Sequence, residues 1–95
     1  MTDKSADDLH NELMDYPCVF TIKTMGHAAN SQFNLIVVEI IRRHVTEIAE
    51  NAVTSKFSKT KKYISLSVTI TAENKQQMDA IYKDLSDCEH VLMSL

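Results

Sequence analysis

The sequence has little of what usually shapes loops and cross-links: one glycine, one proline, two cysteines and no tryptophan among 95 residues. Two cysteines without C-x-x-C spacing build no disulfide framework, so we expect Cys18 and Cys88 to be free thiols in a reducing compartment. A single glycine excludes the glycine-rich loops that cradle phosphates. No apolar run approaches the roughly 20 residues of a membrane-spanning helix. These absences favour a small globular domain without nucleotide or membrane chemistry.

The composition, 44% hydrophobic and 24% charged residues, is typical of a globular protein and leaves room for one core. The first residues are acidic and polar, where a secretory signal would be basic and then apolar, so we expect a cytoplasmic protein. We assign residues 1–16 to an acidic lead-in that is disordered or partly helical around residues 9–14. Residues 17–95 form the single predicted domain. The net charge of −3 is uneven, because residues 16–63 carry seven bases and three acids.

Hydrophobic periodicity predicts four strands and two helices. Apolar and polar residues alternate over residues 17–26, 51–58, 62–72 and 90–95, which is the pattern of half-buried strands. Apolar residues recur at helical spacing from Phe33 to Ile48, after Asn30 or Ser31 as the N-cap. A second helix begins at Asn74, with Gln77 three residues later completing a capping-box pattern.

The order β-α-β-β-α-β predicts an α+β, ferredoxin-like fold. Right-handed crossovers give an antiparallel four-stranded sheet in the order 4-1-3-2, with both helices on one face. Gly26 ends the first predicted strand. A glycine there serves either a turn with positive φ or a close approach to the backbone. We expect the turn, in which the chain passes sharply onto the helical face.

The residues capable of chemistry form no recognisable site. The four histidines lie in different predicted elements without H-x-x-H or H-E-x-x-H spacing, whereas a zinc site needs three or four convergent ligands. Neither cysteine stands in a recognisable motif with a general base and a third group that orients the base, and an activated nucleophile requires both. We therefore expect no metal, no cofactor and no enzymatic activity.

The face of the predicted sheet opposite the helices is rich in short hydroxyl side chains and has few charges. An RNA-binding domain of the same topology stacks bases on aromatic residues of its central strands, and here only Tyr63 is aromatic. The face is either an ordinary solvated surface or a contact surface for a protein partner or a second copy. The predicted contact residues are Lys23, Met25, Tyr63, Ser65 and Leu92. The alternative is a nucleic-acid-binding module that uses this face and the lysine-rich hairpin at residues 58–63.

Five segments in order carry a family resemblance: "FTIKTMG", "VVEIIRRH", "YISLSVTI", "IYKDL" and "VLMSL". With the lead-in "NELMDYP", the chain resembles the YbeD-like family of small uncharacterised bacterial proteins over about residues 9–95. The resemblance implies a ferredoxin-like fold similar to regulatory ACT domains, and a regulatory role that has been labelled lipoic acid-binding. Two features depart from the family: the hairpin "SKTKKY" lacks the usual glycine, and Leu92 stands where a basic residue is common.

By the ACT-like comparison, the turn after the first strand would bind a ligand through Gly26, His27 and Asn30. Exposed backbone N–H groups and the positive end of the following helix favour a carboxylate there. The resulting hypothesis is a non-catalytic regulatory or adaptor domain that binds a small metabolite, such as a lipoate-like carboxylate, or a protein partner.

Overall fold

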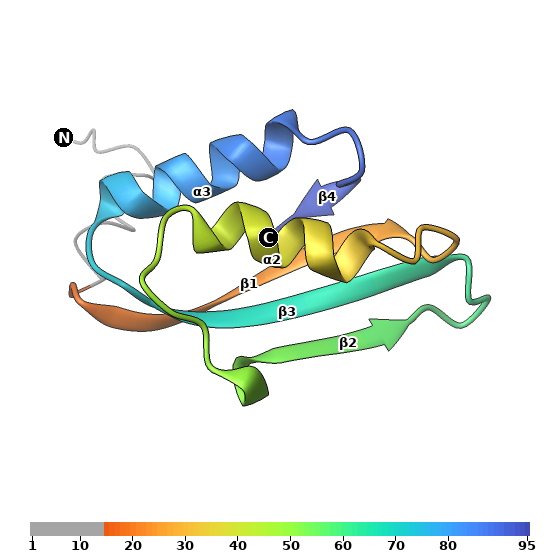
Figure 1. The fold of residues 1–95 in the computed structure, drawn as a ribbon, viewed down its shortest axis with the longest axis horizontal. Helices are drawn as coiled ribbons and strands as arrows, with labels where there is room; N and C mark the ends of the chain where they lie inside the picture. The colour runs from red at the N-terminus through yellow and green to blue at the C-terminus, as the bar shows by residue number, and fades with distance from the viewer. Residues whose placement is uncertain (1–14) are drawn as a thin grey trace, which may run out of the picture.

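The computed structural model describes residues 15–95, which contain two helices and four strands (Figure 1). The predicted lead-in and its helical turn at residues 9–14 lie outside the described residues. The elements are β1 (Cys18–His27), α2 (Phe33–Arg42), a short 3-10 helix (Glu50–Ala52), β2 (Val53–Phe57), β3 (Tyr63–Ala72), α3 (Lys75–Asp87) and β4 (Met93–Ser94). Within the described range, no helix is long and apolar enough to cross a bilayer.

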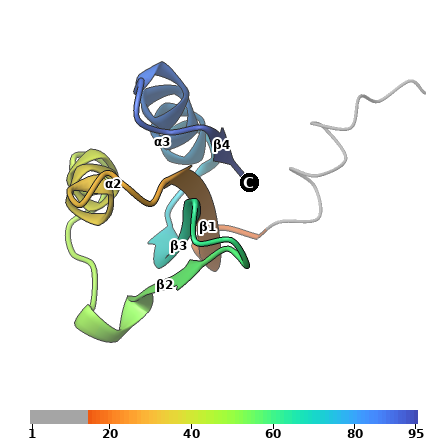
Figure 2. The same cartoon turned by 90° about the vertical axis from the view of Figure 1, so that its right-hand side faces the viewer.

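The sheet has the order β2-β3-β1-β4 and every neighbouring pair is antiparallel, which confirms the predicted 4-1-3-2 order read from the opposite edge. The central pair, β1 and β3, is matched over ten residues from Cys18 opposite Ala72 to His27 opposite Tyr63. Figure 2 shows both helices on the same side of the sheet, so neither of them covers its other face. The α+β, ferredoxin-like prediction is therefore confirmed.

The core lies between this sheet and the two helices. Alternation places every second residue of β1 and β3 toward the helices, where the apolar stripes of α2 and α3 meet them. The buried apolar residues are Ile22, Phe33, Val37, Ile40, Ile41, Ile64, Leu66, Val68, Ile70, Ala72, Met78, Ile81 and Leu85. Both faces of β3 are thus assigned as the sequence predicted.

Helix α2 is shorter than predicted. It begins at Phe33 and ends at Arg42, whereas the apolar periodicity suggested a helix continuing to Ile48. The N–H groups of Arg43 and His44 bond to carbonyls three residues back, at 3.3 and 3.0 Å, which tightens and ends the last turn. Ile48 still packs against the core, but from the connection to β2. Apolar residues after Arg42 therefore continue the helical spacing because they pack against the same core, although they are not part of the helix.

The N-terminus of α2 also differs from the prediction. Gln32 is the N-cap and makes no side-chain capping bond. The side-chain oxygen of Asn30 instead accepts from the N–H of Gln32 at 3.0 Å, two residues on, as in a local turn. Helix α3 begins as predicted, because the Asn74 side chain accepts from the N–H of Gln77 at 2.8 Å.

Strand β4 is confined to Met93 and Ser94, which pair with Met25 and Thr24. Backbone hydrogen bonds continue on either side of it. The N–H of Leu92 donates to Met25 at 2.8 Å, and the N–H of Leu95 donates to Lys23 at 2.7 Å. The predicted strand at residues 90–95 is therefore present only in its second half.

The predicted turn at Gly26 is wrong. Gly26 lies inside β1 opposite Ile64, one residue before the strand ends, and its φ is not positive. A Cβ added there would lie 2.3 Å from Cε1 of the Phe33 ring. Of the two explanations that the sequence allowed, the structure supports close approach, and the approaching group is a core side chain.

The hairpin between β2 and β3 turns without glycine. The N–H of Lys61 donates to the carbonyl of Ser58 at 2.9 Å, and the Ser58 hydroxyl accepts from the N–H of Tyr63 at 3.1 Å. Lys61 adopts a left-handed conformation with φ of 61°, which glycine adopts at lower cost. A lysine therefore occupies the position where the backbone favours glycine.

Candidate functional site

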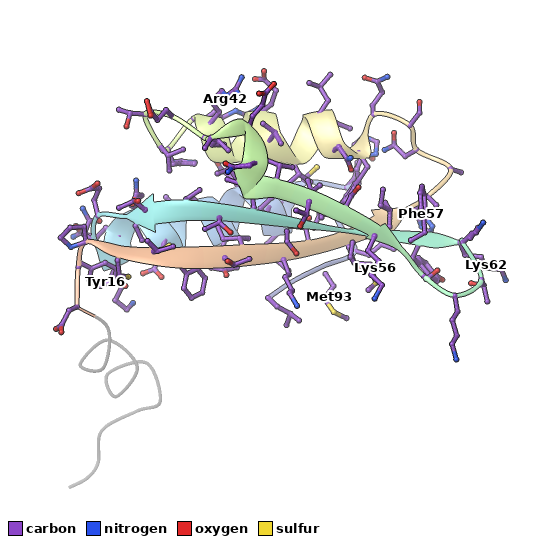
Figure 3. The ribbon with its side chains drawn as sticks, turned by 90° about the horizontal axis from the view of Figure 1, so that it is seen from below. Tyr16, Arg42, Lys56, Phe57, Lys62 and Met93 are labelled. Atoms are coloured by element: carbon purple, nitrogen blue, oxygen red, sulfur yellow. The ribbon has the colours of Figure 1, made fainter. Side chains whose placement is uncertain are left out.

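The uncovered side of the sheet, called here the open face, is formed by the outward residues of all four strands. Figure 3 shows Lys56 and Met93 projecting from this side, away from Arg42 on the helical layer. By register and alternation it consists of Val19, Thr21, Lys23, Met25, His27, Thr54, Lys56, Tyr63, Ser65, Ser67, Thr69, Thr71 and Met93. The hydroxyls of Thr21 and Thr69 bond to each other across the central strands at 2.9 Å. Most of the surface is therefore uncharged.

The charges on this surface and in the adjoining hairpin loop have one sign. Lys23 and Lys56 lie on the open face, and three more lysines lie in the hairpin loop at residues 58–62 that extends from its end. Together these lysines make up five of the ten Lys and Arg residues of the chain. None of the acidic residues in the described range belongs to the open face or the hairpin loop. A protein with net charge −3 thus presents a basic surface here.

The structure brings four of the five predicted contact residues together. Lys23, Met25, Tyr63 and Ser65 all lie on the open face. Leu92 lies elsewhere, because it precedes β4 on the side of Ser94 and lines a surface hollow with Tyr82 of α3. Its neighbour Met93 takes the place beside Met25. In the sequence, the alternation of residues around Met93 already indicates that Leu92 and Met93 point to opposite sides of the strand.

A hollow of about 590 Å³ opens at the hairpin end of the sheet. Its walls come from the end of β1 and from the hairpin, which the Ala28 N–H joins by donating to the carbonyl of Lys62 at 2.9 Å. The lining residues are His27, Ala28, Ala29, Phe57, Lys61, Lys62 and Tyr63. The hollow combines two lysines, a histidine and two aromatic rings, without an acidic residue among its lining.

Two of the rings that line this hollow lie side by side on the central strands β1 and β3. His27 and Tyr63 are register partners, and their ring centroids are 5.7 Å apart at a tilt of 34°. Phe57, at the end of the edge strand, is 54% exposed. Figure 3 shows Phe57 and Lys62 near each other at this end of the molecule. Exposed apolar surface therefore lies next to free cationic groups.

The predicted ligand residues do not form one site. Gly26 is buried, with the Phe33 ring in front of it, so a ligand has no access to its backbone from the helical side. The Asn30 side chain is paired with His90 Nδ1 at 3.4 Å and with the N–H of Gln32. Only His27 faces the hollow. The role expected of Gly26 as a ligand contact stays a prediction.

A polar cluster that the sequence did not predict joins the two helices. His44 Nε2 lies 2.7 Å from Asp84 Oδ2, and the side-chain N–H of Gln77 donates to the His44 carbonyl at 2.7 Å. No nucleophilic side chain in the described part of the chain is hydrogen-bonded to either member of this pair. The cluster holds the end of α2 against α3. Asp84 is forty residues from His44, so no local pattern indicated the contact.

Residues 15–95 contain no assembled metal site and no disulfide. No group of three or more histidine, cysteine or acidic side chains is placed to hold a metal ion there. Cys18 and Cys88 are free and half-buried. Cys88 borders a second hollow, of about 480 Å³, between α2 and α3, which is lined by both acidic and basic residues.

Comparisons with known proteins place the whole described domain in one group. A family model described as "Protein of unknown function (DUF493)" matches residues 11–95. A UPF0250 protein of Pectobacterium carotovorum is 39% identical over 85 residues, covering 90% of this chain and 94% of the relative. A UPF0250 protein of Chromobacterium violaceum is 35% identical over 88 residues, covering 93% and 98%.

A solved structure is also similar. The solution structure of protein HP0495 from H. pylori superposes with a TM-score of 0.62 at 15% sequence identity, covering 99% of this chain and 98% of that chain. At this identity the likeness supports the fold alone. The descriptions of these proteins state no ligand, so the lipoate part of the sequence-based expectation stays a prediction.

Proposed function

Because the chain belongs to the DUF493/UPF0250 family of small bacterial proteins of unknown function, we propose its function from its own surface: a non-catalytic adaptor or regulatory domain that binds a protein partner through the open face. The observation that carries the proposal is that neither α2 nor α3 covers one side of the sheet. Thirteen outward residues from four strands form that surface. Both helices pack on the other side.

The chemistry of the open face suits contact with another protein. Short hydroxyl side chains such as Thr21 and Ser67 lose little conformational entropy on burial and can form hydrogen bonds with a partner. Met25 and Met93 lie opposite each other and add adaptable apolar surface. Val19 is 73% exposed at the far end of the face. A partner surface would bury these groups without having to desolvate an ion pair.

The metabolite form of the hypothesis has less support. A lipoate-like carboxylate was expected at Gly26, His27 and Asn30, but Gly26 is covered by Phe33 and Asn30 is paired with His90. Small-molecule sites are usually concave and bury most of their ligand. The hollow beside His27 is bounded by exposed side chains.

Nucleic acid is the alternative partner, because the hairpin lysines would attract phosphates. Single strands, however, bind to platforms on which several bases stack, and on the open face only His27 and Tyr63 carry rings. Binding of a nucleic acid should depend more strongly on salt than binding of a protein partner, because phosphate contacts weaken steeply as salt is added. An oligonucleotide that binds more tightly than any protein partner would replace the proposal.

Affinity capture with face-specific variants tests the proposal. Wild-type protein, an open-face variant (Ser67→Tyr) and a helix-face variant (Glu39→Gln) are immobilised and exposed to extract of the native host. Ser67 and Glu39 lie on opposite sides of the sheet, and both are accessible. We expect a partner that wild type and Glu39→Gln retain and Ser67→Tyr loses.

The captured protein must then bind in purified form, with cross-links to the open face, and Ser67→Tyr must remain folded by circular dichroism. Loss of capture by Glu39→Gln alone would move the binding surface to the helices. Equal capture by all three proteins would refute the proposal.

A further inference from the structure

We propose that the hollow at the hairpin end of the sheet binds an acidic segment of the partner protein, whose carboxylates meet Lys61, Lys62 and His27 while an adjacent apolar side chain packs on Phe57. This inference rests on the proposed function and names the chemistry of the partner. The juxtaposition behind it is the meeting of cationic and aromatic groups from β1 and the hairpin in one hollow of about 590 Å³.

Charge complementarity identifies the partner as acidic. The open face and the hairpin loop hold five of the ten Lys and Arg residues of the full chain and none of the acidic residues in the described range. By contrast, the exposed lysines of α3 are already paired, Lys75 with Asp79 and Lys83 with Asp87, each at 3.0 Å. The hairpin lysines have no acidic partner within the described residues. Their charges are therefore available to a ligand.

The backbone of the hairpin fixes where these charges point. Bonds from Ser58 to Lys61 and to Tyr63 close the turn, and the bond from Ala28 to Lys62 ties it to β1. Lys61 retains a lysine side chain at a left-handed position that favours glycine. Such a position is a reason to look for a role of the side chain, because strain of this kind gathers at binding sites.

The aromatic walls distinguish this site from a simple basic patch. Phe57 is 54% exposed, so its ring can gain contact area when a ligand arrives. Phe57 shares the sheet side of Ile64, whereas Tyr63 lies on the open face beside His27. The His27 ring, 5.7 Å from that of Tyr63, carries an N–H donor in either neutral tautomer. A carboxylate can thus accept hydrogen bonds while the neighbouring residue of its chain covers a ring. Free phosphate or a bare carboxylate would use only half of the site.

The hollow is also continuous with the open face. His27 and Tyr63 belong to both, since they are the last register pair of β1 and β3 before the hairpin. Lys23 and Lys56 extend the positive charge along the open face toward Met93. One partner can therefore cover the open face and place an acidic segment in the hollow.

Fluorescence anisotropy with labelled pentapeptides tests the inference on the full chain. The probe is Glu-Glu-Phe-Glu-Glu, and the controls are Gln-Gln-Phe-Gln-Gln and Glu-Glu-Ser-Glu-Glu, at about 20 mM salt, where exposed charges are weakly screened. We expect the first peptide to bind more tightly than both controls. Equal binding of the glutamine peptide would refute the electrostatic part, and equal binding of the serine peptide would refute the aromatic part.

Variants test whether the peptide binds in the hollow at the hairpin end. Lys61→Gly/Lys62→Ser should weaken binding of the first peptide roughly five- to tenfold, because each exposed charge pair contributes modestly. Lys61→Gly relieves the left-handed position, so loss of binding cannot be attributed to unfolding. Phe57→Ser should weaken the phenylalanine peptide but not the serine peptide. Lys83→Ser, on α3, removes one positive charge elsewhere and should alter the affinity less than twofold.

Four further outcomes would overturn the inference. Equal weakening by Lys83→Ser would show attraction to net charge only. Tighter binding of an octauridylate oligonucleotide to the same hollow would assign the site to nucleic acid. Full competition by octanoate or lipoate at the peptide's concentration would assign it to a free metabolite. If Ser67→Tyr abolishes partner capture while Lys61→Gly/Lys62→Ser does not, the open-face function stands and the hollow has no part in it.

Discussion

The phenyl ring of Phe33 occupies the space where a side chain on Gly26 would lie. A Cβ at Gly26 would come within 2.3 Å of Cε1, 2.5 Å of Cδ1 and 2.8 Å of Cζ of that ring. Phe33 is the first residue of α2 and is 1% exposed. The glycine therefore sets how closely the start of α2 can approach β1.

Gly26→Ala should lower the free energy of unfolding by about 1–3 kcal/mol, because overpacking forces a buried ring off its rotamer or shifts the helix. The backbone at Gly26 has no positive φ, so conformational strain contributes little to this loss. Urea unfolding followed by circular dichroism measures the difference. A stability equal to that of wild type would mean that Phe33 can move without cost.

A double-mutant cycle with Phe33→Leu tests whether the destabilisation by Gly26→Ala comes from its contact with the Phe33 ring. Phe33→Leu alone should destabilise the domain by leaving a cavity, and it should also make room for the methyl group of Gly26→Ala. The double variant should then be more stable than the sum of the single changes requires, by about 1 kcal/mol or more. Additive losses would place the effect of Gly26→Ala outside this contact.

Lys61→Gly should raise the free energy of unfolding by about 0.5–1 kcal/mol. The left-handed conformation at φ of 61° costs a residue with a Cβ about 1–2 kcal/mol, and the greater freedom of glycine in the unfolded chain offsets part of the gain. Lys61→Ala keeps the Cβ and should bring no such gain. If alanine stabilises as much as glycine, the gain comes from removing the lysine charge among its neighbours.

The sequence predicted the parts of the fold that depend on local burial. In β3 one face is buried along the whole strand, so the period of two in the sequence identified both faces, including Leu66 and Ser67. The strand order followed because crossover connections are right-handed. Asn74 was identified as a cap because its side chain bonds within its own turn.

The features that the sequence could not predict depend on contacts between distant segments. The end of α2 is set by the turn at Arg43 and His44 and by the pair of His44 with Asp84 of α3. The apolar spacing in the sequence continues beyond this end, so it predicted a longer helix. The role of Gly26 depends on a ring seven residues away that packs across from another element. In the candidate site, the hairpin lysines were visible in the sequence. Their convergence with Phe57 and His27 required the sheet register.

The two faces of β3 should respond differently to the same substitution. Leu66 is completely buried, so Leu66→Asp would place an unpaired carboxylate in the core and cost several kcal/mol, enough to unfold a small domain. Ser67 lies on the open face opposite Lys23, where Ser67→Asp gains an oppositely charged neighbour. Thermal unfolding of the two variants compares them. Similar melting temperatures would contradict the assignment of the faces.

Alkaline pH should destabilise the domain partly through Tyr82. Its hydroxyl donates to the carbonyl oxygen of Leu95 at 2.8 Å, and burial raises the pKa of its phenol above the ordinary value of 10.0. The neutral form is the protonated one, so the folded state holds this proton to higher pH than the unfolded chain. Stability from this difference is fully present below the unfolded pKa and is lost as pH rises through the folded pKa.

Tyr82→Phe removes both the hydrogen bond and the titrating group. The variant should be less stable than wild type at neutral pH, and the gap should narrow above about pH 10 as wild type loses the contribution of its protonated phenol. Urea unfolding at a series of pH values measures the gap, and phenolate absorbance should show one titration step fewer in the variant. A gap that stays constant from neutral to alkaline pH would show that the Tyr82 phenol ionises with the same pKa in the folded and unfolded chains.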